Sequence, residues 1–207
     1  MSVATPGKYH GEVYEYRIDE EEMSMTSKGN MENAPGAQGK PPSGIAALTA
    51  ELESLWRRRR GLLVRDGLID PATDLSAPGE PAAECDIQAV EDFYKVKLPL
   101  DYVEFMKLHN GWAGLDYDLL STGQMLRGEL YDYVGKIKEV WRLEGDAVLP
   151  EGIPIYAGQD LRAFTFFDRH TNPMKVRDYT DNLEYPSFSA YLENWVTSFK
   201  KWIREEE

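Results

Sequence analysis

The sequence predicts a protein that contains both helices and antiparallel strands, because it holds helical patterns and strand patterns in different stretches of the chain. Apolar residues recur at steps of three and four over about 44–63 and again after Pro186, as in amphipathic helices. Between these regions, short apolar or aromatic runs after Trp112 are bounded by Gly, Asp, Asn and Pro, as antiparallel strands usually are. Hydrophobic residues make up 42% of the chain, so one core can form.

The first 43 residues differ in composition from the rest. They are rich in Gly, Pro, Ser, Asn and charge, and bury too little apolar surface to offset the entropy of ordering. We predict a flexible N-terminal segment over 1–43, within which "EVYEYRI" could form a strand that adds to a sheet edge or stays loose. An amphipathic helix and a linker then occupy 44–84, and the main domain occupies 85–207.

The helix over about 44–63 carries the most basic run in the chain, "WRRRRGLL" from Trp56 to Leu63. Such a run can contact nucleic acid or a membrane. In an acidic protein, four arginines more often form a solvated helix face that pairs with nearby acids, and we favour that interpretation. The three prolines and the glycine of 69–84 then predict a linker.

Two further helices are predicted at the start of the main domain. The first has Ile87, Val90 and Tyr94 at helical spacing, with Asp86 as its N-cap. The second lies in "KLPLDYVEFMKLHNGW", where Pro99 precedes the helix and Asn110-Gly111 ends it. One face of this second helix holds Tyr102, Phe105, Met106 and His109.

The remaining main domain alternates strand and helix patterns. The predicted strands are "DYDLLS", "GELYDYV", "GIPIYAG", "RAFTFFD" and "MKVRDYT". Within this region, "YVGKIKEVWRLE" has helical spacing and predicts a helix. The final stretch, "YPSFSAYLENWVTSFKKWIREEE", predicts a helix capped by Ser187, and its aromatic stripe must be covered by the rest of the domain.

Charge and cysteine usage bound the partners and the compartment. The net charge of −13 argues against a nucleic-acid binder and suits either a partner with a basic surface or simple solubility. The single cysteine, Cys85, excludes an intramolecular disulfide and a multi-cysteine zinc site. Neither a signal peptide nor a stretch of about 18 apolar residues is recognisable, so we expect a cytoplasmic protein without a membrane span.

The sequence contains no familiar catalytic motif. It has no Gly-rich phosphate loop of the usual form, no Gly-x-Ser-x-Gly and no His-Glu-x-x-His, which lowers the expectation of an enzyme. We expect no cofactor and no metal. His10 lies in the N-terminal segment and His109 on a helix face. His170 follows Asp168 in a predicted hairpin turn, and a turn role is favoured over an acid-base pair. Cys85 is placed in the linker beside two carboxylates, which disfavour a thiolate.

Acidic and aromatic residues are mixed after Trp112, in "GLDYDLL" and "GELYDYV". Carboxylates steer a cationic partner and aromatic rings supply contact area, so this pattern indicates an interface. Strand carboxylates that face water explain the same pattern slightly better.

The order of these elements resembles the SUKH superfamily, which includes the yeast cell-wall assembly regulator and many bacterial immunity proteins. The resemblance rests on "IQAVEDFYKVKLP", on "LPLDYVEFMKLHNGW" with its Leu-Pro-x-Asp-Tyr start, on "LPEGIPIYAGQDLRAFTFFD" and on "YPSFSAYLENWV". It covers about 85–203. The family's turn usually carries an extra Gly-Gly-Asp-like element, and "AGQDLRAF" is shorter here.

The resemblance implies an α+β SUKH-like domain, with helices packed around a mixed or antiparallel sheet and without enzymatic activity. Bacterial members typically bind and neutralise a polymorphic toxin encoded beside them, so we expect an immunity protein that occludes a toxin's active or substrate-binding site. The alternative is a regulatory scaffold that binds a host protein. Because the family transfers no fixed contacts, the candidate toxin-binding residues come from the acidic and aromatic pattern: Asp116, Tyr117, Asp118, Glu129, Tyr131, Asp132 and Asp160.

Overall fold

The computed structural model describes residues 44–72, 78–113, 117–143, 145, 148, 151–158, 164–179 and 182–206. These residues belong to one compact unit, 40–207. The predicted flexible segment over 1–43, with its possible strand and His10, lies outside the described residues.

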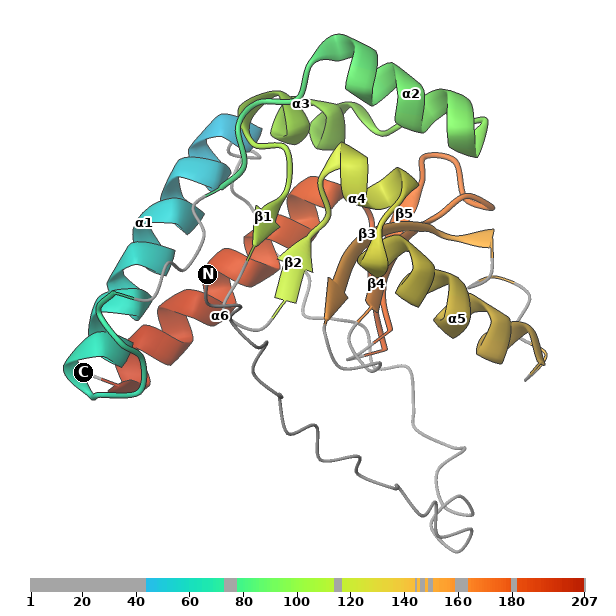
Figure 1. Ribbon diagram of the computed structural model, residues 1–207. Coiled ribbons are helices and arrows are strands. Elements are labelled where there is room, and N and C mark those ends of the chain that lie inside the picture. Colours follow the sequence, from blue (N-terminus) through green and yellow to red (C-terminus); the bar gives the residue numbers. More distant parts are fainter. Residues whose placement is uncertain are drawn as a thin grey trace, which may run out of the picture. The chain divides into compact units, whose positions relative to one another are not determined.

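The centre of the fold is an antiparallel sheet. Its strands follow one another in chain order, and every pair of neighbours is antiparallel (Figure 1). The described strands are β1 (Trp112–Ala113), β2 (Tyr117–Leu119), β3 (Ile153–Gly158), β4 (Phe164–Asp168), β5 (Lys175–Asp178) and β6 (Leu183–Tyr185). The sequence predicted β2 to β5, whereas β1 and β6 have only two and three residues and give no readable alternation.

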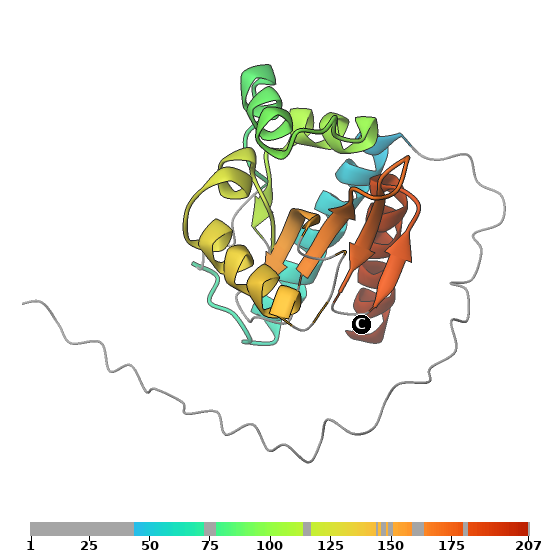
Figure 2. The same ribbon diagram turned by 90° about the vertical axis from the view of Figure 1, so that its right-hand side faces the viewer.

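Helices cover both faces of this sheet. They are α1 (Ile45–Arg65), α2 (Glu84–Tyr94), α3 (Leu100–Leu108), α4 (Thr122–Leu126), α5 (Glu129–Leu143) and α6 (Phe188–Glu206). Figure 2 shows the sheet between α5 and α6, with α1 beside α6. The α+β fold is therefore confirmed, with an antiparallel sheet and an N-terminal helix.

Strand β4 is buried along its whole length because alternate residues meet different helices. Phe164 contacts Trp141 of α5, with ring centroids 5.5 Å apart. The next residue, Thr165, places its hydroxyl 3.2 Å from the hydroxyl of Tyr191 on α6. Burial on both faces explains why this strand reads as a continuous apolar run.

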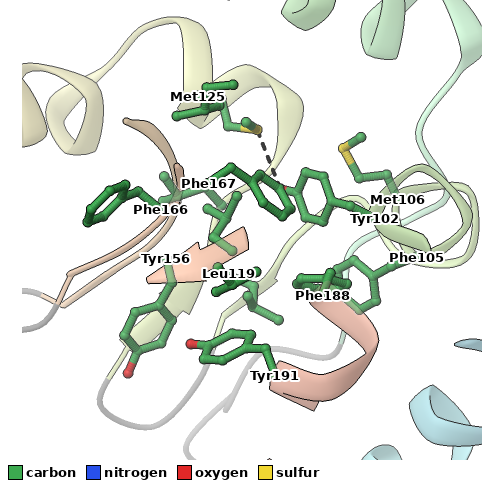
Figure 3. Close-up of a cluster of buried hydrophobic side chains, with 14 of the residues drawn as sticks. Tyr102, Phe105, Met106, Leu119, Met125, Tyr156, Phe166, Phe167, Phe188 and Tyr191 are labelled. Carbon is green, nitrogen blue, oxygen red and sulfur yellow. Dashed lines mark hydrogen bonds between the residues drawn. The ribbon is translucent and has the colours of Figure 1, made fainter. Parts of the chain in front are cut away.

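An aromatic cluster joins α3, β4 and α6 at the centre of the core (Figure 3). The Tyr102 ring lies edge-on to Phe188 at 4.8 Å and to Phe167 at 5.0 Å between centroids. Its hydroxyl donates to the Met125 sulfur at 3.5 Å, and burial raises the pKa of this phenol. The predicted apolar face of α3 is confirmed for Tyr102, Phe105 and Met106, all of which are buried.

The Asn110-Gly111 pair follows the end of α3 and positions the next helix. Gly111 has φ +85°, and a Cβ atom there would come within 2.7 Å of the Ser121 backbone nitrogen. Only glycine fits this left-handed position. Asn110 accepts from the Thr122 backbone N–H at 2.7 Å and donates to the Thr122 hydroxyl at 3.0 Å, so it fixes the first turn of α4.

The arginine run packs partly onto the domain. Arg59 lies over the rings of Phe199 at 5.4 Å and Trp202 at 4.9 Å, both on α6. Arg57 is exposed and pairs with Glu53 one turn earlier at 2.5 Å. The predicted solvated face therefore describes Arg57, whereas Arg59 is part of the contact between α1 and α6.

Three local predictions were wrong. "GELYDYV" forms the start of α5 instead of a strand, because Leu130, Val134 and Ile137 continue the helical spacing that leads to Trp141. Helix α2 begins at Glu84 after the N-cap Ala83, so Asp86 is not the N-cap. Cys85 therefore lies exposed in the first turn of α2 instead of in a linker.

The end of α3 differs from the predicted one, whereas the beginning of α6 agrees with it. His109 is the C-cap of α3 and lies just outside the helix. Its ring is 5.9 Å from that of Trp112, so its role is packing. The predicted Ser187 cap of α6 is confirmed, since its hydroxyl accepts from the Ala190 backbone N–H at 3.1 Å.

Candidate partner-binding site

The structure places three of the seven predicted contact residues on one helix. Glu129, Tyr131 and Asp132 lie in the first turn of α5. Glu129 and Asp132 are exposed and three residues apart, so their carboxylates share one face of the helix. These two acids and Tyr131 are called the α5 acidic start below.

The other four predicted contacts are described only in part. Tyr117 and Asp118 belong to β2, where they pair with Gly158 and Ala157, but their side chains are outside the described part of the chain. Asp116 and Asp160 lie wholly outside the described residues. The structure therefore brings Glu129, Tyr131 and Asp132 together, and the grouping of all seven residues stays a prediction.

A pocket of about 640 Å³ lies beside the α5 acidic start, between α2 and α5. We call it the α2–α5 pocket. Tyr131 and Asp132 line it from α5, and Phe93 and Tyr94 line it from α2. The Phe93 ring lies edge-on to Tyr94 at 5.0 Å and to Tyr131 at 6.1 Å between centroids, although half of its surface is exposed.

Polar residues also line the α2–α5 pocket. Arg169, which follows β4, donates to the backbone carbonyl of Tyr94 at 3.2 Å and lies 3.7 Å from the Glu151 carboxylate. Lys138 of α5 donates to the carbonyl of Gly152, and burial lowers the pKa of its ammonium to about 8. The Tyr94 hydroxyl donates to the Met125 carbonyl at 2.8 Å, and burial raises its pKa.

Sequence reasoning missed Phe93, Lys138 and Arg169 as members of one site. They belong to α2, to α5 and to the turn after β4, and no local spacing connects them. Tyr131 and Lys138 are seven residues apart, so a helical interpretation of "GELYDYV" would have placed them on one helix face. This shared face is the one local pattern that connects residues of the pocket.

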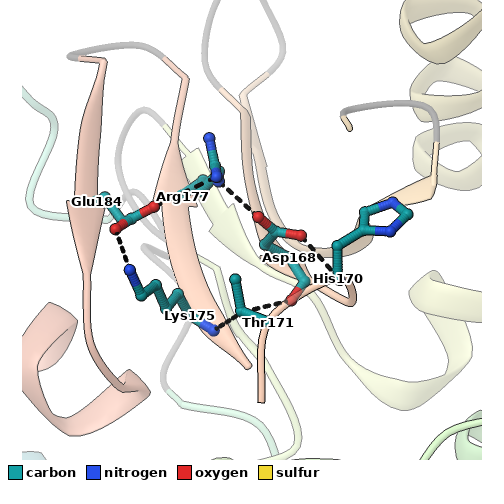
Figure 4. Close-up of polar contacts among 6 residues, drawn as sticks. All are labelled: Asp168, His170, Thr171, Lys175, Arg177 and Glu184. Carbon is teal, nitrogen blue, oxygen red and sulfur yellow. Dashed lines mark hydrogen bonds and ion pairs between the residues drawn. The ribbon is translucent and has the colours of Figure 1, made fainter. Parts of the chain in front are cut away.

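The Asp168 and His170 pair is a structural turn. The Asp168 carboxylate, which is almost fully buried, accepts from the Arg177 guanidinium at 2.8 Å and from the backbone N–H of His170 at 2.9 Å. Figure 4 shows the His170 ring directed away from this carboxylate. Lys175 and Arg177 in turn pair with Glu184 of β6, at 2.6 Å and 3.3 Å. The arrangement therefore cross-links three strands, and the favoured turn role is confirmed.

Two classes of feature are absent from the described residues. No group of three or more His, Cys, Asp or Glu side chains among them could hold a metal ion. None of the helices in the described ranges is long and apolar enough to cross a membrane.

Comparison with known families gives one match. The model of the SMI1 / KNR4 family (SUKH-1) matches residues 81–196, which is more than half of the chain. The matched region begins just before α2 and ends within α6, so it contains the whole sheet and the α2–α5 pocket. A search of curated proteins found no match.

Proposed function

Because this chain belongs to the SMI1 / KNR4 family (SUKH-1), we propose that it is an immunity protein that binds and neutralises a cognate bacterial polymorphic toxin. The family match over 81–196 is the observation that carries this proposal, since the family is known for immunity proteins that are generally not enzymes. The order of helices around an antiparallel sheet supports it.

The mechanism we favour is occlusion of the toxin's active or substrate-binding site. A net charge of −13 suits a toxin with a basic surface, because opposite fields accelerate association. The α5 acidic start offers two exposed carboxylates beside a partly buried tyrosine, a combination of steering charge and aromatic contact area that is typical of interfaces. Asp116, Tyr117, Asp118 and Asp160 are proposed to extend the same surface.

Co-expression with the product of the neighbouring gene tests this function. If that product is a toxin, the chain should restore growth and be captured with the toxin in a pull-down. Failure of rescue together with capture of a host protein would favour the alternative, a non-enzymatic regulatory scaffold.

Charge reversal tests the contact surface separately. In the double variant Glu129→Lys and Asp132→Lys, the association rate constant with the toxin should fall by about tenfold or more at low salt, and its salt dependence should weaken. Glu205→Lys with Glu206→Lys is the matched control, because it changes the net charge equally at exposed positions near the end of α6. Equal slowing by both double variants would indicate an effect of net charge alone and would remove the α5 acidic start from the interface.

A further inference from the structure

The α2–α5 pocket has the size of a small-molecule site. Its volume of about 640 Å³ lies within the roughly 300–1,000 Å³ of typical ligand pockets. Its walls are two helices and the segments that flank β3 and β4, so its position is set by the sheet. Such pockets usually combine aromatic side chains with a few polar groups that orient the ligand.

One wall of the α2–α5 pocket is aromatic. Phe93 keeps 50% of its surface exposed, which is unusual for so large an apolar side chain. Edge-on contacts with Tyr94 and Tyr131 hold its ring in place. A fixed ring that is half in water offers a flat apolar surface to a second ring, which would gain both burial and an aromatic contact.

The charged residues that line the pocket carry an excess of positive charge. Three cations, Lys136, Lys138 and Arg169, face two carboxylates, Asp132 and Glu151, in a chain whose net charge is −13. The local balance of +1 therefore opposes the charge of the whole molecule. This local excess favours an anion at a site where the rest of the chain would repel one.

Lys138 is a partly buried cation whose hydrogen-bond acceptor is uncharged. Its ammonium donates to the neutral carbonyl of Gly152, and no carboxylate of the described residues lies within ion-pairing distance of it. Glu151 lies 3.7 Å from Arg169, and its charge raises the pKa of Lys138 without reversing the effect of burial. The lowered pKa of Lys138 reflects this partial burial, and an anionic oxygen beside the ammonium would stabilise its charged form.

We infer that the α2–α5 pocket binds a small free molecule that carries a carboxylate or phosphate group on a flat aromatic ring. The anionic group accepts hydrogen bonds from Lys138 and Arg169, and the ring packs against Phe93. This inference goes beyond toxin neutralisation and does not depend on it.

A titration of the full 207-residue chain, followed by NMR, tests the inference with three probes. Phenylphosphate contains both the ring and the anion, phenol contains only the ring, and inorganic phosphate contains only the anion. We expect phenylphosphate to bind about tenfold or more tightly than either of the others. Equal affinity of phenylphosphate and inorganic phosphate, or no binding up to about 20 mM, would overturn the inference.

Variants locate the binding in the pocket. Lys138→Met and Phe93→Ala should each weaken phenylphosphate binding by about tenfold, and Lys138→Arg should retain most of it. The controls are Lys200→Met, on α6, and Leu100→Ala, which is 82% exposed on α3. Lys136→Met, at an exposed position, should weaken binding about two- to fivefold and remains informative if Lys138→Met does not fold.

Two outcomes of this series have definite meanings. Binding that is indifferent to Phe93→Ala, Lys136→Met and Lys138→Met lies elsewhere on the protein and contradicts the inference. Because these measurements contain no toxin, failure here leaves rescue by co-expression unaffected, and failure of rescue leaves the phenylphosphate result unaffected.

Discussion

The carboxylate of Asp101 caps the N-terminus of helix α6 by binding Ser189, which lies 88 residues further along the chain. Its Oδ2 atom accepts from the Ser189 backbone N–H at 2.8 Å and from the Ser189 hydroxyl at 2.9 Å, while Oδ1 accepts from the Tyr102 backbone N–H at 3.0 Å. One acid in the first turn of α3 therefore satisfies the otherwise unpaired N–H groups of two helices. The Asp of the Leu-Pro-x-Asp-Tyr stretch thus joins α3 to α6, the last helix of the matched region.

Replacement of Asp101 by Ala should lower the free energy of unfolding by about 1–3 kcal/mol, because partly buried donors on α6 lose a charged acceptor. Asp101→Asn should lose less, since its amide oxygen can still accept one hydrogen bond. Urea unfolding measures both. Glu104→Ala, at an exposed position of the same helix, is the control, and an equal loss there would contradict the capping role.

Arg59 and Arg57 belong to the same basic run and provide a matched pair. Arg59→Ala should lower the free energy of unfolding by about 1–2 kcal/mol, because it removes the guanidinium from the rings of Phe199 and Trp202. Arg57→Ala should change it less, because Arg57 forms an exposed ion pair within its own helix. Thermal unfolding of both variants measures this difference in stability. Equal losses of stability would show that the contact of Arg59 with α6 adds nothing.

Asp168 and His170 should differ sharply in their effect on stability. Asp168→Ala should cost about 2–4 kcal/mol, because it leaves the Arg177 guanidinium and the His170 backbone N–H without their buried acceptor. His170→Ala should be nearly neutral in chemical denaturation, because the hydrogen bond comes from its backbone. A large loss in His170→Ala would mean that the imidazole itself supports the turn.

Lys138 should make stability depend on alkaline pH. Its pKa falls from 10.5 to about 8 in the folded protein, chiefly through burial, with Arg142 and Arg169 lowering it further and Glu151 opposing the change. Between about pH 8 and 10.5 the unfolded chain therefore binds more protons than the folded chain, so this lysine's contribution to stability rises with pH. The cost of burying its charge is fully present below about pH 8.

Comparison with Lys138→Met isolates this contribution. At pH 7 the variant should be more stable than the parent by up to about 3 kcal/mol, less the lost hydrogen bond to Gly152. The difference should shrink between about pH 8 and 10, as urea titrations at several pH values would show. The buried tyrosines titrate alike in both proteins and cancel. A difference that stays constant over this range would contradict the lowered pKa.

The sequence predicted the elements whose signal is local. Regular spacing found α1, α3 and α6, and the Pro99 boundary of α3 was correct because it depends on the backbone of neighbouring residues, whereas the helix ends at Leu108, two residues before Asn110-Gly111. The same local view misread "GELYDYV", in which a short alternation of apolar and acidic residues resembles a strand. The helical spacing becomes clear only when the residues up to Trp141 are included.

The candidate site was less accessible to this reasoning. The acidic and aromatic composition pointed to Tyr131 and Asp132, which do line the α2–α5 pocket. Phe93, Lys138 and Arg169 could not be added, because they come from separate elements that only the tertiary fold brings together. The role of Asp101 in capping α6 could not be predicted for the same reason, since the N–H group from which it accepts a hydrogen bond lies far away in the chain.

The contact between α1 and α6 extends past the family match at both ends. Helix α1 precedes residue 81, and the residues of α6 that it meets, among them Phe199, Lys200 and Trp202, follow residue 196. Helix α1 and the last part of α6 bury each other's apolar side chains, so a boundary drawn at either edge of the match would leave an apolar helix face in water. The cooperative folding unit is therefore longer than the region that defines the family, and any excised domain must keep both extensions.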